Sequence, residues 1–166
     1  MITVDYVRAL ARYNSWQNGS IYGAADSLTD AQRKEQRGAF FGSIHGTLNH
    51  LLWGDQMWMS RFAGSPKPKV SIAGSTDMFA SWDELKRERL AFDHVISDWA
   101  GKLEPVWLEG DLTWFSGNAG RDVTKPKWLV TTHMFNHQTH HRGQVHCMLT
   151  QCGVKPGATD LPFQSV

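Results

Sequence analysis

The chain has 166 residues, of which 41% are apolar and 20% are charged, and this composition excludes an intrinsically disordered protein. Seventeen basic residues against sixteen acidic ones give a formal net charge of +1 without any dense basic run, so we expect neither nucleic acid nor an anionic membrane surface as a partner. No segment approaches the roughly twenty apolar residues of a membrane span, and the N-terminus lacks an unbroken apolar stretch, so we expect one cytoplasmic domain over residues 1–166.

The first two predicted elements are helices. Apolar residues recur at helical spacing from Val4 for about twenty residues, up to the polar stretch SLTDAQRKEQRG. A second apolar pattern with the same period covers residues 40–62 and begins with two phenylalanines. Two prolines, two glycines and several serines in AGSPKPKVSIAGS then predict a loop behind the second helix.

A third helix and a short hairpin follow. Ser81 with Glu84 three residues later is a capping-box signature, and the apolar pattern behind it predicts a helix that ends between residues 101 and 105. The helical period then stops, and the stretches DLTWFS and RDVT predict two short strands around a turn.

The fourth helix is bracketed by residues that favour helix ends. Thr124 is the candidate N-cap, Pro126 stands just inside the expected start, and Gly153 follows the last periodic residue. These signals predict a helix over about 126–152. Four long helices without an internal repeat predict an all-α fold, a four-helix bundle with a small β-hairpin insert between the third and fourth helices.

Four of the chain's eight histidines fall within eleven consecutive positions of this fourth helix. At about 100° per residue, His133 and His141 lie roughly 40° to either side of His137, and His140 lies about 60° away. Gln144 shares this face, where it could bond an imidazole or a substrate. One side of the helix therefore carries a cluster of imidazoles that need polar partners wherever they are buried.

Metal is one such partner. Histidines at i and i+4, as in His137 and His141, can bind one cation, which is how HExxH helices hold zinc. Position 138 is Gln, so the glutamate that serves as base in HExxH peptidases is missing and a peptidase is not predicted. His146 falls on the opposite side of the helix, where a surface or packing role is expected.

A third ligand has to come from another helix, and His50 is the candidate. Within about 60° of its direction lie four small residues, which predict space for a ligand: Ser43, Gly46, Thr47 and Gly54. Trp53 and Met57 flank His50 as candidate pocket walls, although such residues also fit a plain core. Hydrogen-bonded core histidines would give the same pattern, so spacing alone leaves both interpretations open.

Two further pairs lead to structural predictions. Asp55 and Arg142 are expected to form a buried ion pair between the second and fourth helices. Cys147 and Cys152 are five residues apart and so point to different sides of the helix, and we expect buried thiols rather than a disulfide or a metal pair.

Four longer stretches of the chain carry a family resemblance: THMFNHQTHHRGQVHCMLTQCG, FFGSIHGTLNHLLWGDQMWMSRF, ARYNSWQN and ATDLPF. Together they resemble the DinB family of metal-dependent proteins. The resemblance implies a four-helix bundle in an up-down-down-up arrangement with one divalent metal ion held by His50, His137 and His141. His133 and His140 match positions that often hold His in similar sequences, and the resemblance places them around the ligands or along the pocket.

The same resemblance implies a function class. Relatives include metal-dependent transferases that use low-molecular-weight thiols such as bacillithiol, mycothiol or glutathione, together with thiol-dependent isomerases and hydrolase-like members. We therefore expect a small-molecule substrate, a thiol co-substrate and zinc or nickel as the cofactor, with iron or manganese as the alternative metals. A metal-dependent hydrolase, or a metal- or ligand-binding stress protein without turnover, remains an alternative, so enzymatic activity is left open.

Two more expectations concern behaviour in the cell. The family is named for induction by DNA damage, which does not imply contact with DNA. The many aromatic residues would allow one face of the bundle to be buried in a homodimer.

Overall fold

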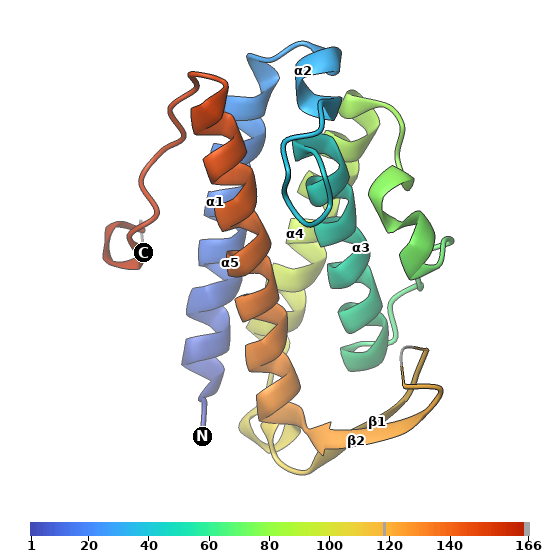
Figure 1. Ribbon diagram of the computed structural model, residues 1–166. Coiled ribbons are helices and arrows are strands. Elements are labelled where there is room, and N and C mark those ends of the chain that lie inside the picture. The colour runs from blue at the N-terminus through green and yellow to red at the C-terminus, as the bar shows by residue number, and fades with distance from the viewer. Residues whose placement is uncertain (118, 165–166) are drawn as a thin grey trace.

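Four long helices dominate the computed structural model, which describes residues 1–117 and 119–164. They are α1 (Val4–Asp26), α3 (Ile44–Phe62), α4 (Trp82–Lys102) and α5 (Lys127–Gln151), and they lie side by side (Figure 1). Helix α1 packs against α4 and α5, and α3 packs against the same two helices. The prediction of a mainly helical fold with one small hairpin is therefore confirmed.

The start of α3 differs from the prediction. Residues 40 and 41 form part of a turn, and the helix begins only at Ile44. Gly38 and Gly42 adopt positive φ angles of 74° and 75°, which favour glycine, and the Ser43 side chain accepts a hydrogen bond from the first turn of the helix. Phe40 and Phe41 fit the apolar spacing of a helix, but the turn places both residues outside α3.

Short helices occupy two of the predicted connecting segments. Helix α2 (Asp30–Lys34) lies in the polar stretch behind α1, where Thr29 and Gln32 form a reciprocal capping box. The 3-10 helix η1 (Ile72–Asp77) begins in the predicted loop, extends two residues beyond it and packs against α3. Two further 3-10 helices, η2 (Pro105–Leu108) and η3 (Leu161–Phe163), follow α4 and α5.

The N-terminus of α4 and the hairpin follow the sequence prediction closely. The Ser81 side chain accepts a hydrogen bond from the Glu84 backbone N–H, as a capping residue does. Strands β1 (Asp111–Ser116) and β2 (Arg121–Pro126) pair in antiparallel fashion, so the second strand is two residues longer than RDVT. Position 118 in the predicted turn lies outside the described residues.

The predicted start of α5 was wrong. Thr124 does not cap the helix, because it belongs to β2, where it pairs with Thr113 and their hydroxyl oxygens lie 2.8 Å apart. Pro126 ends the strand and precedes the first helical residue, Lys127, without a side-chain cap. At the other end Gly153 has a φ of 77° and follows the helix as predicted.

The apolar core is divided into two clusters by a polar layer. Leu48 and Leu149 belong to a cluster at the end of the bundle near α2, whereas Val7 and Met59 belong to a cluster at the hairpin end (Figure 1). Between them, each of the four long helices places buried polar side chains: Asn14, Gln17, Asn18, His50, Asp55, Arg89, Asp93, Gln138, His141 and Arg142. The middle of the bundle is therefore held by polar contacts.

Arg89 joins the two buried carboxylates of this layer. Its guanidinium lies 2.6 Å from Asp55 on α3 and 2.8 Å from Asp93 on α4. Asn14 and Asn18 of α1 donate hydrogen bonds to the same Asp93 oxygen, at 3.3 and 2.9 Å. Burial opposes the charge on Arg89, but the two carboxylates outweigh it and raise its pKa. The layer thus links α1, α3 and α4.

Helix α5 joins the layer through Gln138 and Arg142, and here the predicted ion pair was wrong. Asp55 pairs with Arg89, and its other oxygen accepts a hydrogen bond from Gln138 Nε2 at 2.8 Å. Arg142 donates instead to the side-chain oxygen of Asn14. The prediction used only the directions of Asp55 and Arg142 on their own helices. It did not consider α4, whose Arg89 is the cation that pairs with Asp55.

The cysteine prediction is confirmed in part. Cys147 and Cys152 are both free thiols, but Cys147 is exposed and Cys152 is only half-buried. The expected burial was wrong because Cys147 lies on the exposed surface of α5, whereas Cys152 caps the end of that helix and packs only partly against the core. Among the described residues, no helix combines the length and apolar character that crossing a membrane requires.

We predict that Arg89→Leu destabilises the protein by about 3–5 kcal/mol, because it leaves two buried carboxylates without their cation. Urea unfolding followed by circular dichroism measures this loss. Lys86→Ala is the control, since Lys86 pairs with Asp26 at the surface and its loss should cost less than about 1 kcal/mol. Equal stability of the two variants would contradict a stabilising role for the buried network.

Candidate metal centre

Three histidines converge between α3 and α5. His50 comes from the middle of α3, and His137 and His141 come from successive turns of α5, which packs against α3. One ring nitrogen of each lies within 4.8 Å of those of the other two. The structure therefore brings together the three residues that spacing and family resemblance had selected as candidate ligands.

Hydrogen bonds orient two of the three rings. The Nδ1 atom of His141 lies 2.8 Å from Gln144 Oε1, an acceptor, so Nδ1 carries the proton and Nε2 keeps a free lone pair. The Nδ1 atom of His50 lies 3.0 Å from Ser75 Oγ, and Ser75 is fully buried on η1. Of the two roles considered for Gln144, the bond to an imidazole is thus present.

All three imidazoles are held in the neutral form that binds a metal ion. Burial, together with the neighbouring His141, lowers the pKa of His50 to about 4. Burial and the surrounding histidines lower the pKa of His137 to about 3, and burial also lowers the pKa of His141. A neutral imidazole offers its lone pair without first losing a proton, so metal binding at neutral pH needs no deprotonation of these rings.

The spacing of two of the ring nitrogens fits one small cation. His50 Nε2 and His137 Nε2 lie 3.3 Å apart. Two nitrogens bound to tetrahedral zinc, each at 2.0–2.1 Å, are separated by about 3.3–3.4 Å. Within the described part of the chain the cluster contains no carboxylate and no thiol, so three neutral ligands would leave the full charge of the cation in place.

Comparison with known proteins identifies the family of the chain. The family model described as DinB family matches residues 1–165. The chain belongs to the DinB family. Protein DinB from Bacillus subtilis (strain 168) is 25% identical to it over 94% of this chain and 91% of that protein. The resemblance seen in short motifs therefore extends over nearly the whole length of this DinB-family chain.

Aromatic side chains cover His50. The ring of Phe41 stacks on it at a centroid distance of 3.7 Å, and the same ring lies 5.1 Å from His141. Trp53 lies 5.7 Å from His50 with nearly parallel planes, and its indole N–H donates to the Val70 carbonyl. Met57 is half-buried, and its expected place in a pocket wall stays a prediction.

The remaining histidines of α5 lie around the cluster. His133 is exposed, with its ring centroid 5.9 Å from that of His137 and 5.2 Å from that of Trp58. His140 is also exposed, and its ring centroid lies 4.8 Å from that of His141. Neither belongs to the group whose nitrogens converge, and the place around the ligands or along the pocket that the resemblance implies for both stays a prediction.

Gln138 stands between the ligands in sequence but points away from them. Its side chain is buried and donates to Asp55 in the polar layer. The space expected beside His50 is occupied at Gly54 by the ring of His137, itself a candidate ligand. At Gly46 it is the backbone of Phe41 that comes close. The small residues of α3 thus let neighbouring groups approach the helix.

Sequence reasoning missed Ser75 and Phe41. Ser75 lies in a segment with loop composition, and no periodicity marks it as the partner of His50. Phe41 was assigned to the helix that follows it, although it comes from the glycine-rich turn. The neighbouring Gly-X-X-X-Gly spacing of Gly38 and Gly42 was the available signal for a turn there.

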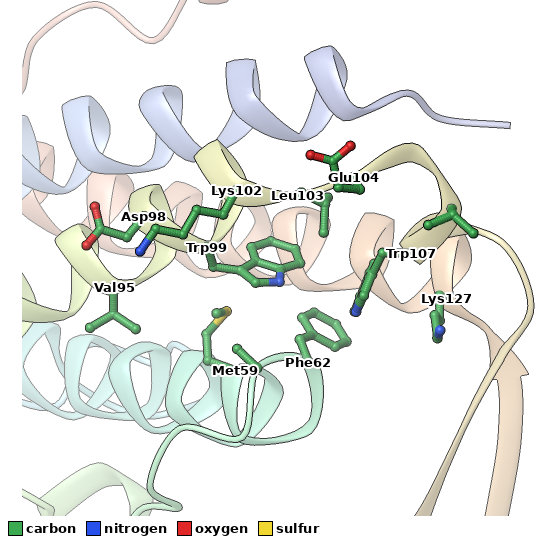
Figure 2. A pocket seen from close by; sticks show the side chains of 12 residues that line it. Met59, Phe62, Val95, Asp98, Trp99, Lys102, Leu103, Glu104, Trp107 and Lys127 are labelled. Atoms are coloured by element: carbon green, nitrogen blue, oxygen red, sulfur yellow. The ribbon is translucent and has the colours of Figure 1, made fainter.

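A separate cavity lies apart from the metal centre. It has a volume of about 700 Å³ and opens between the C-terminal ends of α3 and α4, where Phe62, Trp99 and Trp107 surround it (Figure 2). Met59, another of its lining residues, follows His50 by nine positions, which is about half a turn around α3. Cavity size and metal-binding chemistry therefore point to different places, and we assign the site by its chemistry.

We predict that His50→Ala weakens metal binding by at least about tenfold, because the two remaining histidines cannot complete the site. Metal content after dialysis, measured by plasma mass spectrometry, reports the loss. His146→Ala is the control and should keep the metal, since His146 is not part of the cluster. Unchanged stoichiometry in His50→Ala would refute the three-histidine site.

We further predict that Ser75→Ala lowers metal affinity by about 10–100-fold, because His50 loses the hydrogen bond that orients its ring. A competition titration with a chromophoric chelator measures the affinity. Ser71→Ala provides a matched control, since Ser71 is exposed just before η1 and its side chain makes no capping hydrogen bond. Equal affinities in the two variants would rule out this role for Ser75.

Proposed function

We propose that this chain is a metal-dependent transferase that joins the sulfur of a low-molecular-weight thiol to an electrophilic small molecule. In this proposal His50, His137 and His141 hold zinc or nickel, and the four long helices form the up-down-down-up bundle of the DinB family. The observation that carries the proposal is the all-imidazole donor set, three neutral rings whose nitrogens converge. A thiolate is the kind of anionic partner that such a site favours.

The chemistry follows from that charge balance. When bound, a divalent cation supplies the positive charge that favours a thiolate over a thiol at neutral pH. The thiol proton goes to solvent, the sulfur forms a bond to the electrophilic carbon, and the leaving group departs with the electron pair of the bond that breaks. The protein positions the three histidines that would bind the metal, and the stacked Phe41 ring shields His50 from water.

The position of Gln138 favours this transfer over hydrolysis. A metal-dependent hydrolase commonly uses a carboxylate base next to the metal, as HExxH enzymes do. Here the residue between the two α5 ligands is an amide that points into the core and bonds Asp55. Thiol transfer does not need that base, because the cation itself favours loss of the thiol proton.

We predict metal-dependent conjugation of monochlorobimane with at least one of bacillithiol, mycothiol and glutathione. Fluorescence of the bimane product gives the initial rate, which should exceed the rate without protein. His141→Ala should lose this acceleration, and His146→Ala should keep it, because only His141 belongs to the cluster. Intact metal binding without acceleration for any of the three thiols would favour the binding protein without turnover.

A further inference from the structure

Gly54 lies against the ring of a candidate ligand. It is buried on α3, four residues after His50, and faces α5. A Cβ atom at this position would lie 3.1 Å from His137 Cε1 and 3.6 Å from His137 Nδ1. The first separation is shorter than ordinary van der Waals contact, so any larger residue here would push against that ring.

The His137 ring has little room to retreat. Its Nε2 lies 3.3 Å from His50 Nε2, and its centroid lies 4.5 Å from that of His141. The ring of His133 follows on the same helix at a centroid distance of 5.9 Å. A shift of a few tenths of an ångström at Cε1 therefore moves the adjacent Nε2 by a similar amount. Metal–ligand distances tolerate only about 0.2 Å.

The other helical glycines near the site have different surroundings. A Cβ at Gly46 would lie 2.8 Å from the backbone oxygen of Phe41, so glycine there allows the turn before α3 to pass close to the helix. A Cβ at Gly143, in the middle of α5, would meet nothing within 4 Å. Gly54 differs from both, because within 4 Å its absent side chain would meet only the His137 ring.

We infer that Gly54 is a positioning residue for the metal centre. Its lack of a side chain lets the His137 ring lie directly against α3, which is what brings His137 Nε2 to 3.3 Å from His50 Nε2. Glycine in the interior of a helix lowers helix stability, so Gly54 destabilises α3 locally while it allows the ligand ring to be placed. The inference rests on the proposed function in one respect, the assignment of His137 as a ligand.

The test compares Gly54→Ala with Gly143→Ala. Zinc affinity, measured by chelator competition, should fall about tenfold or more in Gly54→Ala and stay unchanged in Gly143→Ala. In the metal-free proteins, Gly143→Ala should raise the Tm by about 2–4 °C through better helix propensity. Gly54→Ala should remain folded by circular dichroism, which separates a displaced ligand from a lost fold.

A second measurement reports the ring itself. In the metal-free protein, the Cε1–H proton resonance of His137 should shift in Gly54→Ala and not in Gly143→Ala, because only the first variant places a methyl group against it. Wild-type zinc affinity together with an unshifted resonance in Gly54→Ala would overturn the inference. Loss of folding in Gly54→Ala would overturn it as well, since glycine would then serve helix packing.

Zinc affinity and thiol conjugation together separate this inference from the proposed function. If the wild-type protein binds no metal, the proposed function fails and the ligand-positioning role fails with it. If the wild-type protein binds zinc and Gly54→Ala binds it equally well, only the role of Gly54 fails. If Gly54→Ala binds zinc weakly but the wild type conjugates no thiol, the positioning role stands and the transferase proposal fails.

Discussion

The buried pairing of Arg89 with Asp55 and Asp93 is the contact on which the middle of this bundle depends. A charge taken out of water is costly unless partners surround it, so the three side chains must meet within hydrogen-bonding distance. This requirement fixes the position of α3 relative to α4 along the helix axes. Gln138 donates a hydrogen bond to Asp55, so the same network also fixes the position of α5 along the helix axes. An apolar contact surface would allow the helices to slide more freely.

The metal centre uses this alignment. His137 precedes Gln138 in the chain, so the residue that bonds Asp55 also fixes the level at which the α5 histidines face α3. His50 lies just over one turn before Asp55 on α3. The same segments of α3 and α5 therefore place both the charged network around Asp55 and the histidine cluster between these two helices. Gly54 stands between His50 and Asp55 and lets α5 come close.

Different kinds of contact complete the site. Ser75 reaches His50 from a 3-10 helix in a connecting segment, and Phe41 reaches it from the turn before α3. These connections thus do more than join the bundle helices, because each supplies one side chain to the surroundings of His50. The groups around the imidazoles also suit a neutral site. The Ser75 hydroxyl, the Gln144 amide on α5 and aromatic rings orient and cover the imidazoles without adding charge.

The sequence by itself determined most local features, apart from the starts of α3 and α5. Helical period, the Ser81 cap, the two strands and the i,i+4 pair of His137 and His141 depend on neighbours along the chain, and they could be predicted. Only the tertiary structure decided which distant residues meet. Ser75 bonds a residue 25 positions away, and Arg89 takes the place beside Asp55 that had been assigned to Arg142. Helical angles give a direction but no distance, and the competition between buried cations is settled by packing in three dimensions.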